Sequence, residues 1–179
     1  MSPTLQKPFL RLKSRKEALY KQLHDLSTEQ LQWQPASNQW SIAQVLHHLN
    51  FSERTSLAYC KKKILAGEDL PDRSFVRTMR IHAYYLILKS KYKIKAPAVV
   101  EAPGNEFDLA ALHAEAQQNS ADLEDFINSY PDRFLKKAIY RHPLAGRITL
   151  PQMIRFLDTH VIHHRHQIND RLSRLPSSF

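Results

Sequence analysis

Apolar residues recur three and four positions apart over long windows of this chain, which is the spacing of one face of an α-helix. In the first such window, Phe9, Leu12, Leu19 and Leu23 predict a helix over residues 5–24. The whole chain has only three glycines that could interrupt such windows. Helices should therefore dominate the fold, and strands should be few.

Two segments carry the Ser/Thr-x-x-Gln pattern of a capping box, one from Ser41 to Gln44 and one from Thr149 to Gln152. In this pattern the hydroxyl and the glutamine amide satisfy free backbone donors at a helix start. The first box predicts a long helix that reaches about residue 66 and is ended by Gly67. The second predicts a final helix that continues to about residue 175.

Two further windows show helical spacing, over residues 75–92 and 107–130. Between these windows we expect an extended linker over residues 93–105, because its two Ala-Pro steps disfavour a helix. We also expect a short turn over residues 27–31 and a loop over residues 141–148. The predicted fold class is all-α, a four-helix bundle with an extra short helix and long connections.

Composition fits a single domain over residues 1–179, because 42% apolar residues can close one core without disulfides. The lone Cys60 cannot form an internal bridge, and the N-terminal residues lack the apolar core of a secretory signal, so we expect a cytoplasmic protein. No window approaches the roughly 18–20 apolar residues of a membrane-spanning helix, so we expect no membrane partner.

The net charge of +9 and the pI of 9.7 raise the question of nucleic-acid binding. The basic residues are scattered over residues 7–21, 61–63 and 89–95, without interleaved aromatics or a helix-turn-helix spacing. We favour a solvated basic surface, or a field that steers an anionic substrate, and keep DNA or RNA binding as an alternative.

The last predicted helix places four histidines within seven positions, in the run HVIHHRHQI. Successive helical residues turn by about 100°, which puts His164 in the apolar sector and His160 at its edge. His163 and His166 fall on the outer side together with Arg155, so we expect them to face solvent.

Histidines four apart on a helix can both reach one divalent ion, although the same pair also suits buried histidines bonded to polar neighbours. The second long helix repeats the pattern, with His48 at the rim of its apolar sector and His47 on the outer side. His48 therefore offers a third metal ligand from another helix.

Glu53 and Gln167 each have two interpretations, whereas Cys60 and His142 have one. Glu53 points to the core, where a metal-bound imidazole or a salt bridge to a basic residue of a neighbouring helix would offset its burial. Gln167 lies beside His160 on the wheel and either orients a ligand or solvates the rim. Cys60 is interpreted as a buried structural thiol, and His142 as a cap on its local backbone.

The run from Trp40 to Leu49, Glu53, the segment HPLAG and the His160-x-x-x-His164-x-x-Gln167 pattern together resemble the DinB-like superfamily over nearly the whole chain. This resemblance implies a bundle that holds a divalent metal, often nickel or zinc, through one histidine of the second helix and two of the last. Matched onto this chain, the implied ligands are His48, His160 and His164. Gln44 stands where many relatives carry an acidic residue, and either side chain can complete the helix cap.

Relatives in that superfamily include thiol S-transferases that use bacillithiol, a mycothiol-dependent isomerase, and proteins assigned only by inference as metal-dependent hydrolases. Three neutral nitrogen ligands leave coordination positions on the ion open for a thiol or a water molecule. A thiol bound there would lose its proton and become a thiolate, and a bound water would become a hydroxide. We expect a metal-dependent enzyme with a small-molecule substrate, and a low-molecular-weight thiol as its cofactor if it is a transferase. A homodimer stays open. A structural metal closed by a fourth ligand such as Glu53 is the non-catalytic alternative.

Overall fold

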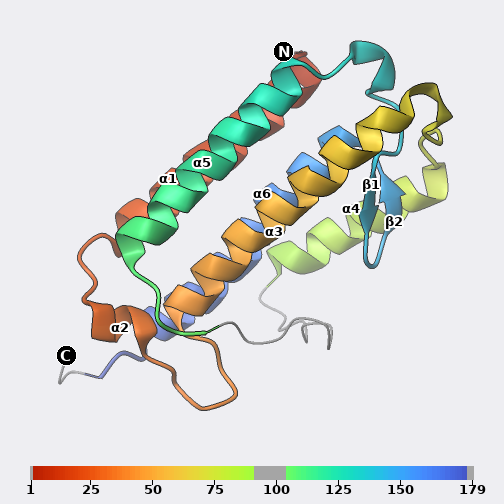
Figure 1. The fold of residues 1–179 in the computed structure, drawn as a ribbon. Coiled ribbons are helices and arrows are strands. Elements are labelled where there is room, and N and C mark those ends of the chain that lie inside the picture. The colour runs from red at the N-terminus through yellow and green to blue at the C-terminus, as the bar shows by residue number, and fades with distance from the viewer. Residues whose placement is uncertain (1, 91–103, 177–179) are drawn as a thin grey trace.

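The computed structural model describes residues 2–90 and 104–176, and helices make up most of this part of the chain (Figure 1). The long helices are α1 (Pro3–Leu23), α3 (Ile42–Lys63), α5 (Leu109–Asn128) and α6 (Leu150–Leu172). The shorter elements are α2 (Thr28–Gln32), α4 (Phe75–Lys89), the 3₁₀ helices η1 (Ile64–Asp69) and η2 (Asp132–Phe134), and the strands β1 (Tyr140–His142) and β2 (Gly146–Ile148). The all-α prediction is confirmed.

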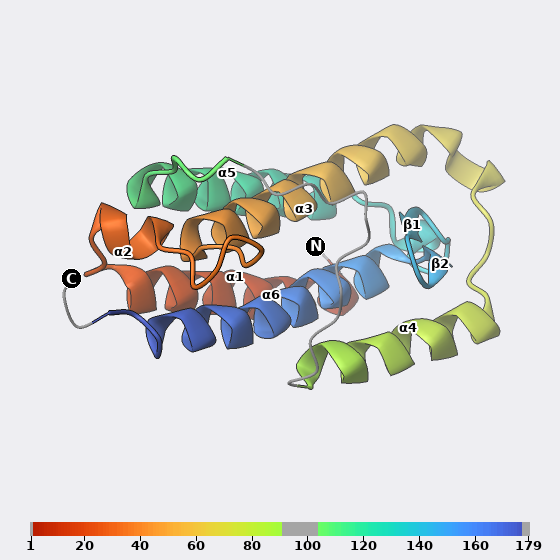
Figure 2. The ribbon, with the colours of Figure 1, turned by 90° about the horizontal axis from the view of Figure 1, so that it is seen from below.

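The four long helices form the bundle, in which each helix packs against two neighbours: α1 against α5 and α6, and α3 against α5 and α6 (Figures 1 and 2). All four residues that predicted the inner face of α1 are fully or almost fully buried: Phe9, Leu12, Leu19 and Leu23. Burial of one such side chain stabilises the fold by about 1.5–3 kcal/mol. The periodicity therefore identified the core face of this helix correctly.

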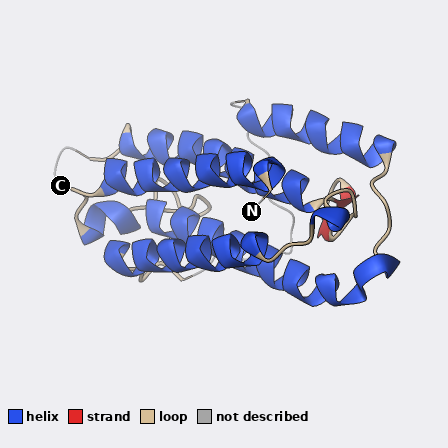
Figure 3. Cartoon of the chain, turned by 90° about the horizontal axis from the view of Figure 1, so that it is seen from above, coloured by secondary structure: helices blue, strands red, loops and turns tan. Residues whose placement is uncertain are grey.

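Helix α4 lies outside the bundle, packed along α6 and against β2 (Figure 3). It buries Ile81, Tyr85 and Leu88, and the Tyr85 hydroxyl donates to the Gln152 carbonyl of α6 at 2.6 Å. Helix α6 is consequently covered on two sides, by the bundle and by α4. The predicted helix over residues 75–92 ends at Lys89 in the described chain, and most of the expected linker lies outside the described residues.

Both predicted capping boxes are present. The Ser41 amide donates to Gln44 Oε1 at 2.9 Å, and the Thr149 amide donates to Gln152 Oε1 at 2.9 Å. A third capping box, led by Ser27, opens α2 where we expected only a turn. Helix α3 ends at Lys63, slightly earlier than predicted, and Gly67 adopts the left-handed φ of 53° in the 3₁₀ segment that follows.

The expected loop over residues 141–148 is instead mostly a β-hairpin, with β1 antiparallel to β2 and His142 opposite Gly146. His142 Nδ1 accepts hydrogen bonds from the amides of Leu144 at 3.2 Å and Ala145 at 3.1 Å, which confirms its predicted capping role. Gly146 has a φ of 75°, a conformation that glycine adopts without a steric penalty. Of the described helices, none has the length and apolar character needed to cross a membrane.

Candidate metal centre

The structure brings His48, His160 and His164 together between α3 and α6. His160 Nε2 lies 3.3 Å from His48 Nε2 and 2.9 Å from His164 Nε2. One nitrogen from each of the three rings lies within 4.8 Å of the other two. The three residues that the sequence and the resemblance pointed to therefore form one cluster.

Helix geometry and aromatic neighbours hold these rings in place. His160 and His164 stand one turn apart on α6 with ring centroids 4.5 Å apart, and the ring of His48 meets them edge-on at 5.0 and 4.9 Å. Phe156 stacks on His160 at 5.2 Å, and Trp40 lies 5.3 Å from His48. His164 is buried, whereas His48 and His160 are half-buried, so solvent reaches one side of the cluster.

The donor set fits a divalent transition ion. Burial lowers the pKa of His48 to about 4 and that of His164 to about 3, with charges on neighbouring histidines adding to the effect. Burial also holds the pKa of His160 well below its ordinary value. All three rings are therefore uncharged near neutral pH, which is the form that binds metals. Nitrogens that share one ion at about 2.0–2.1 Å lie about 2.8–3.4 Å apart, in the range of the two measured separations.

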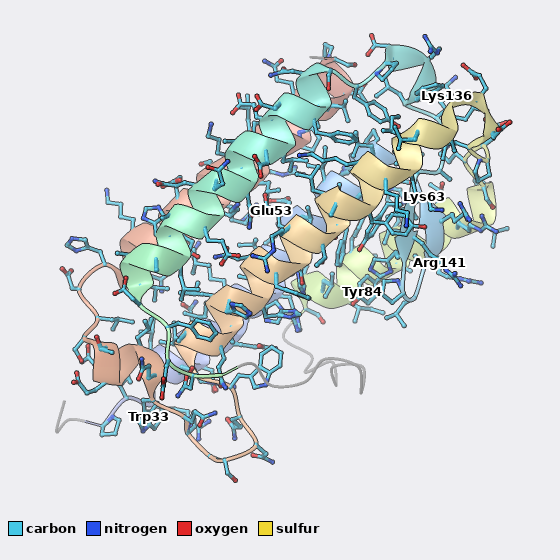
Figure 4. The ribbon with its side chains drawn as sticks, in the orientation of Figure 1. Trp33, Glu53, Lys63, Tyr84, Lys136 and Arg141 are labelled. Carbon is cyan, nitrogen blue, oxygen red and sulfur yellow. The ribbon has the colours of Figure 1, made fainter. Side chains whose placement is uncertain are left out.

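Glu53 of α3, labelled in Figure 4, is not a member of this cluster. Its carboxylate pairs with Lys16 of α1, and Lys16 Nζ also donates to the Ala116 carbonyl and to Ser120 Oγ, both at 2.8 Å. Burial raises the pKa of Glu53, and the charge of Lys16 opposes this shift. The salt-bridge interpretation is confirmed, and no fourth side chain of a ligand type joins the three histidines within the described residues.

A small cavity connects the ion pair with the metal cluster. It has a volume of about 10 Å³ and is lined by Lys16, Glu53 and His160 among others, which is close to the roughly 10–15 Å³ that one water needs. Glu53 Oε1 is buried without a hydrogen-bond partner in the described chain. Among the described residues, no hydrogen bond links Glu53 to one of the three histidines.

Gln167 contacts His164, whereas the wheel had placed it beside His160. Its Oε1 lies 3.0 Å from His164 Nδ1, and its Nε2 lies 3.3 Å from His163 Nε2. A carbonyl oxygen only accepts hydrogen bonds, so His164 donates from Nδ1 and keeps the Nε2 lone pair for the cluster. This contact agrees with the interpretation of Gln167 as a residue that orients a ligand.

The expectation that His163 faces solvent is wrong, since this residue is only 7% exposed. Helix α4 packs on the side of α6 that carries His163. A helical wheel drawn for α6 alone cannot show that another helix packs there. His166 is half-buried, and so is His47, whose ring stacks on Phe107 at 4.5 Å. The outer sides of α3 and α6 are thus less exposed than the wheels implied.

Sequence reasoning did not identify Lys16 as the partner of Glu53, and it missed the ionic contacts of Asp158. The sequence did contain a signal for Lys16: this residue lies four positions after Leu12 and three before Leu19, which is the spacing of the inner face of α1. Asp158 of α6 is buried and accepts hydrogen bonds from Arg11 at 2.8 Å and Arg15 at 2.7 Å. The acidic partners lie far away in sequence, and no local signal pairs them with α1.

Cys60 is fully buried on α3, and burial raises the pKa of its thiol to about 12. A thiol with such a pKa stays protonated near neutral pH and is a poor nucleophile. The structure therefore supports the interpretation of Cys60 as a structural residue.

Comparison with known proteins decides the family. Residues 11–168 match the family model described as the DinB superfamily. The chain belongs to the DinB superfamily. It is also similar to the uncharacterized protein YuaE of Bacillus subtilis (strain 168), with 23% identity over 151 residues that cover 84% of this chain and 88% of that protein. The resemblance inferred from the sequence is confirmed, and the histidine cluster gives this DinB superfamily member a site that could hold a metal.

Proposed function

We propose that this DinB superfamily protein binds one divalent transition ion, nickel or zinc, through His48, His160 and His164, and that it is a metal-dependent enzyme. The observation that carries the proposal is the convergence of three uncharged imidazoles from two helices on one point. Imidazole nitrogen is a preferred donor for both metals.

A bound ion would lower the pKa of a coordinated thiol or water and so supply a thiolate or hydroxide nucleophile. The chain contributes neutral nitrogen donors, aromatic walls from Trp40 and Phe156, and a hydrogen bond from His164 to Gln167. These contacts support a transferase or hydrolase that acts on a small molecule. A low-molecular-weight thiol is the cofactor proposed for the transferase reaction.

Catalysis is favoured over a structural metal because a structural site is usually closed by four protein ligands. Within the described residues the cluster offers three, and Glu53, the candidate fourth, is paired with Lys16. Two of the three histidines are half-buried, so a substrate atom has a side from which to approach. No feature of the site favours nucleic acid as the partner.

Metal analysis of the reconstituted protein tests the binding step. We expect about one ion per chain for the wild type and a large loss of affinity for His48→Ala, because one of three ligands is removed. His24→Ala is the matched control, since the side chain of His24 is 79% exposed and lies outside the cluster. Absence of retained nickel, zinc, manganese or iron in folded wild-type protein would remove the proposal.

Thiol conjugation and ester hydrolysis assays then test the chemistry, with the protein compared before and after chelation. We expect one of the two activities to disappear with the metal and to return when the metal is added back. Equal turnover before and after confirmed metal loss would argue against a metal-dependent reaction.

A further inference from the structure

The outward side of α4 is apolar along the whole helix. This helix lies outside the four-helix bundle (Figure 2), and it buries Ile81, Tyr85 and Leu88 where it packs on α6 and β2. On a wheel of about 100° per residue, every residue of α4 within about 60° of the point opposite Ile81 is apolar. We call these residues the outer α4 face: Phe75, Val76, Met79, Ala83, Leu86 and Ile87.

The outer α4 face is also exposed. Its large side chains are between 48% and 78% accessible, and Ala83 is exposed as well. The other exposed large hydrophobic residues of the described chain are scattered over other elements: Leu10, Phe51, Leu65 and Leu144. An exposed apolar residue that stands alone is normal, whereas a contiguous apolar patch marks a site of interaction with another molecule or with a membrane.

Basic side chains border the outer α4 face on both sides. On the wheel, Arg80 lies beyond one edge, and His82 and Lys89 lie beyond the other; all three are exposed. The helix contains no acidic residue. Long basic side chains can extend along an apolar surface while their charge stays in a polar layer. This arrangement is typical of helices that lie in the headgroup region of anionic membranes.

A pocket of about 250 Å³ opens beside the outer α4 face, between α4, α6 and α1. Its lining includes the basic residues Arg11, Lys89 and Arg155. The acidic residue in the lining, Asp158, is already bound by two arginines of α1. Among the described residues, neither Lys89 nor Arg155 pairs with an acidic group. The pocket therefore suits an anionic group such as a phosphate, and Leu86 of the outer α4 face lines it too.

Charge decides between a membrane and a second copy of this chain as the occupant. In a twofold dimer the outer α4 face would meet the same face of the other copy. Each face is bordered by basic residues and α4 has no acid, so like charges would come together, which opposes association. A membrane with anionic phospholipids supplies both an apolar layer and the phosphates that complement these charges.

We propose that the outer α4 face docks this protein on the surface of a membrane that contains anionic phospholipids. The apolar side chains enter the boundary between headgroups and acyl chains, and Arg80, Lys89 and the neighbouring pocket contact lipid phosphates. The sequence-based expectation of no membrane partner concerned only helices that cross a bilayer, and binding at the surface requires none. The inference goes beyond the proposed function and does not depend on a bound metal.

Co-sedimentation with vesicles tests the role of charge. We expect the wild type to bind vesicles of phosphatidylcholine and phosphatidylglycerol in equal parts, to bind pure phosphatidylcholine far more weakly, and to be released by salt. Arg80→Gln/Lys89→Gln should lower the partition coefficient by about 25-fold, because each basic residue near an anionic surface contributes about fivefold. Lys7→Gln/Lys21→Gln removes the same charge from exposed positions of α1 and should stay within about twofold of the wild type.

The apolar contribution is tested by a single substitution at the centre of the patch. Leu86→Gln should lower the partition coefficient by about 10-fold or more, because this side chain would no longer leave water on binding. Leu10→Gln is the matched control, since Leu10 is an exposed leucine of α1 that lies outside the patch. Both are surface substitutions, and circular dichroism verifies that each variant is folded.

A fluorescent label tests whether the outer α4 face itself enters the lipid. Ala83→Cys provides a thiol for a polarity-sensitive dye, and the buried Cys60 does not compete for the reagent in the folded protein. Anionic vesicles should shift the emission of this label to shorter wavelength. The same dye on Ala121→Cys, an exposed position of α5, should not respond, because α5 lies across the bundle from α4.

Failure of the folded wild type to bind anionic vesicles, or equal binding to both kinds of vesicle, would overturn the inference. An equal loss in the two charge variants would overturn it as well, since binding would then reflect net charge alone. The same holds if Leu86→Gln binds like the wild type, or if the label at position 83 does not respond. A dimer in sedimentation velocity that Leu86→Gln dissociates would assign the outer α4 face to a second copy instead.

Discussion

The buried ion pair between Lys16 and Glu53 leads to a stability prediction that the structure makes quantitative. The side chains are 8% and 5% exposed, and Lys16 is the only cation that pairs with Glu53 in the described chain. Lys16→Met leaves the Glu53 carboxylate without a cation among apolar surroundings. Removal of one partner of a buried pair typically costs about 3–5 kcal/mol.

Protonation of Glu53 limits this cost. A carboxyl group with an ordinary pKa near 4.5 takes up a proton at pH 7 at a cost of about 3.4 kcal/mol, because each pH unit corresponds to about 1.36 kcal/mol. At pH 5.5 the same step costs about 1.4 kcal/mol. A carboxyl whose folded pKa is raised is destabilising above its unfolded pKa, so the penalty in Lys16→Met should shrink as the pH falls from 7 to 5.5.

Urea unfolding of the metal-free protein, followed by circular dichroism at both pH values, measures the effect. We expect Lys16→Met to lower the free energy of unfolding by about 3–4 kcal/mol at pH 7 and by clearly less at pH 5.5. The double variant Lys16→Met/Glu53→Leu should recover most of the loss, because an apolar pair needs no compensating charge. Lys13→Met is the control: its pair with Glu124 is exposed, with 44% and 37% of the side chains accessible, and surface pairs contribute about 0–1 kcal/mol.

A loss below about 1 kcal/mol at pH 7, or a loss of the same size at both pH values, would refute the reasoning. The first outcome would mean that Glu53 is stabilised by something other than Lys16. The second would mean that the loss comes from packing and not from the charge.

Two other residues give predictions that depend on burial. Cys60, with a pKa of about 12, should not react with a thiol-specific reagent until the protein is unfolded, and rapid labelling of the native state would contradict its assignment as a structural residue. Burial lowers the pKa of His142 to about 4 from an ordinary value near 6.5, so its contribution to stability is complete above about pH 6.5 and is lost as the pH falls toward 4. Acidification from pH 6.5 to 5 should therefore lower the free energy of unfolding by about 2 kcal/mol through this residue. In His142→Asn the side-chain oxygen can accept from the same amides but does not titrate, so this part of the pH dependence should disappear. An unchanged pH profile in the variant would refute the assignment.

Local patterns along the chain predicted the four long helices and the inner face of three of them, α1, α3 and α6. The capping boxes at Ser41 and Thr149 act within four residues, so their outcome does not depend on the rest of the fold. The spacing of apolar residues predicted which face of α1, α3 and α6 is buried, and this placed His48, His160 and His164 at or beside the inner face. Local spacing was sufficient here because the bundle core is the partner of every inner face.

Contacts between segments distant in sequence determine which residues are buried on the other sides of these helices. His163 is buried because α4 packs on α6, and the sequence of α6 contains no trace of that neighbour. Lys16 and Glu53 meet across 37 positions of sequence, and the hairpin around His142 depends on pairing between strands of only three residues each. Such contacts form only when packing of the whole core brings distant segments together. The residue pattern of one segment therefore predicts the conformation of that segment, but not the segments that it packs against.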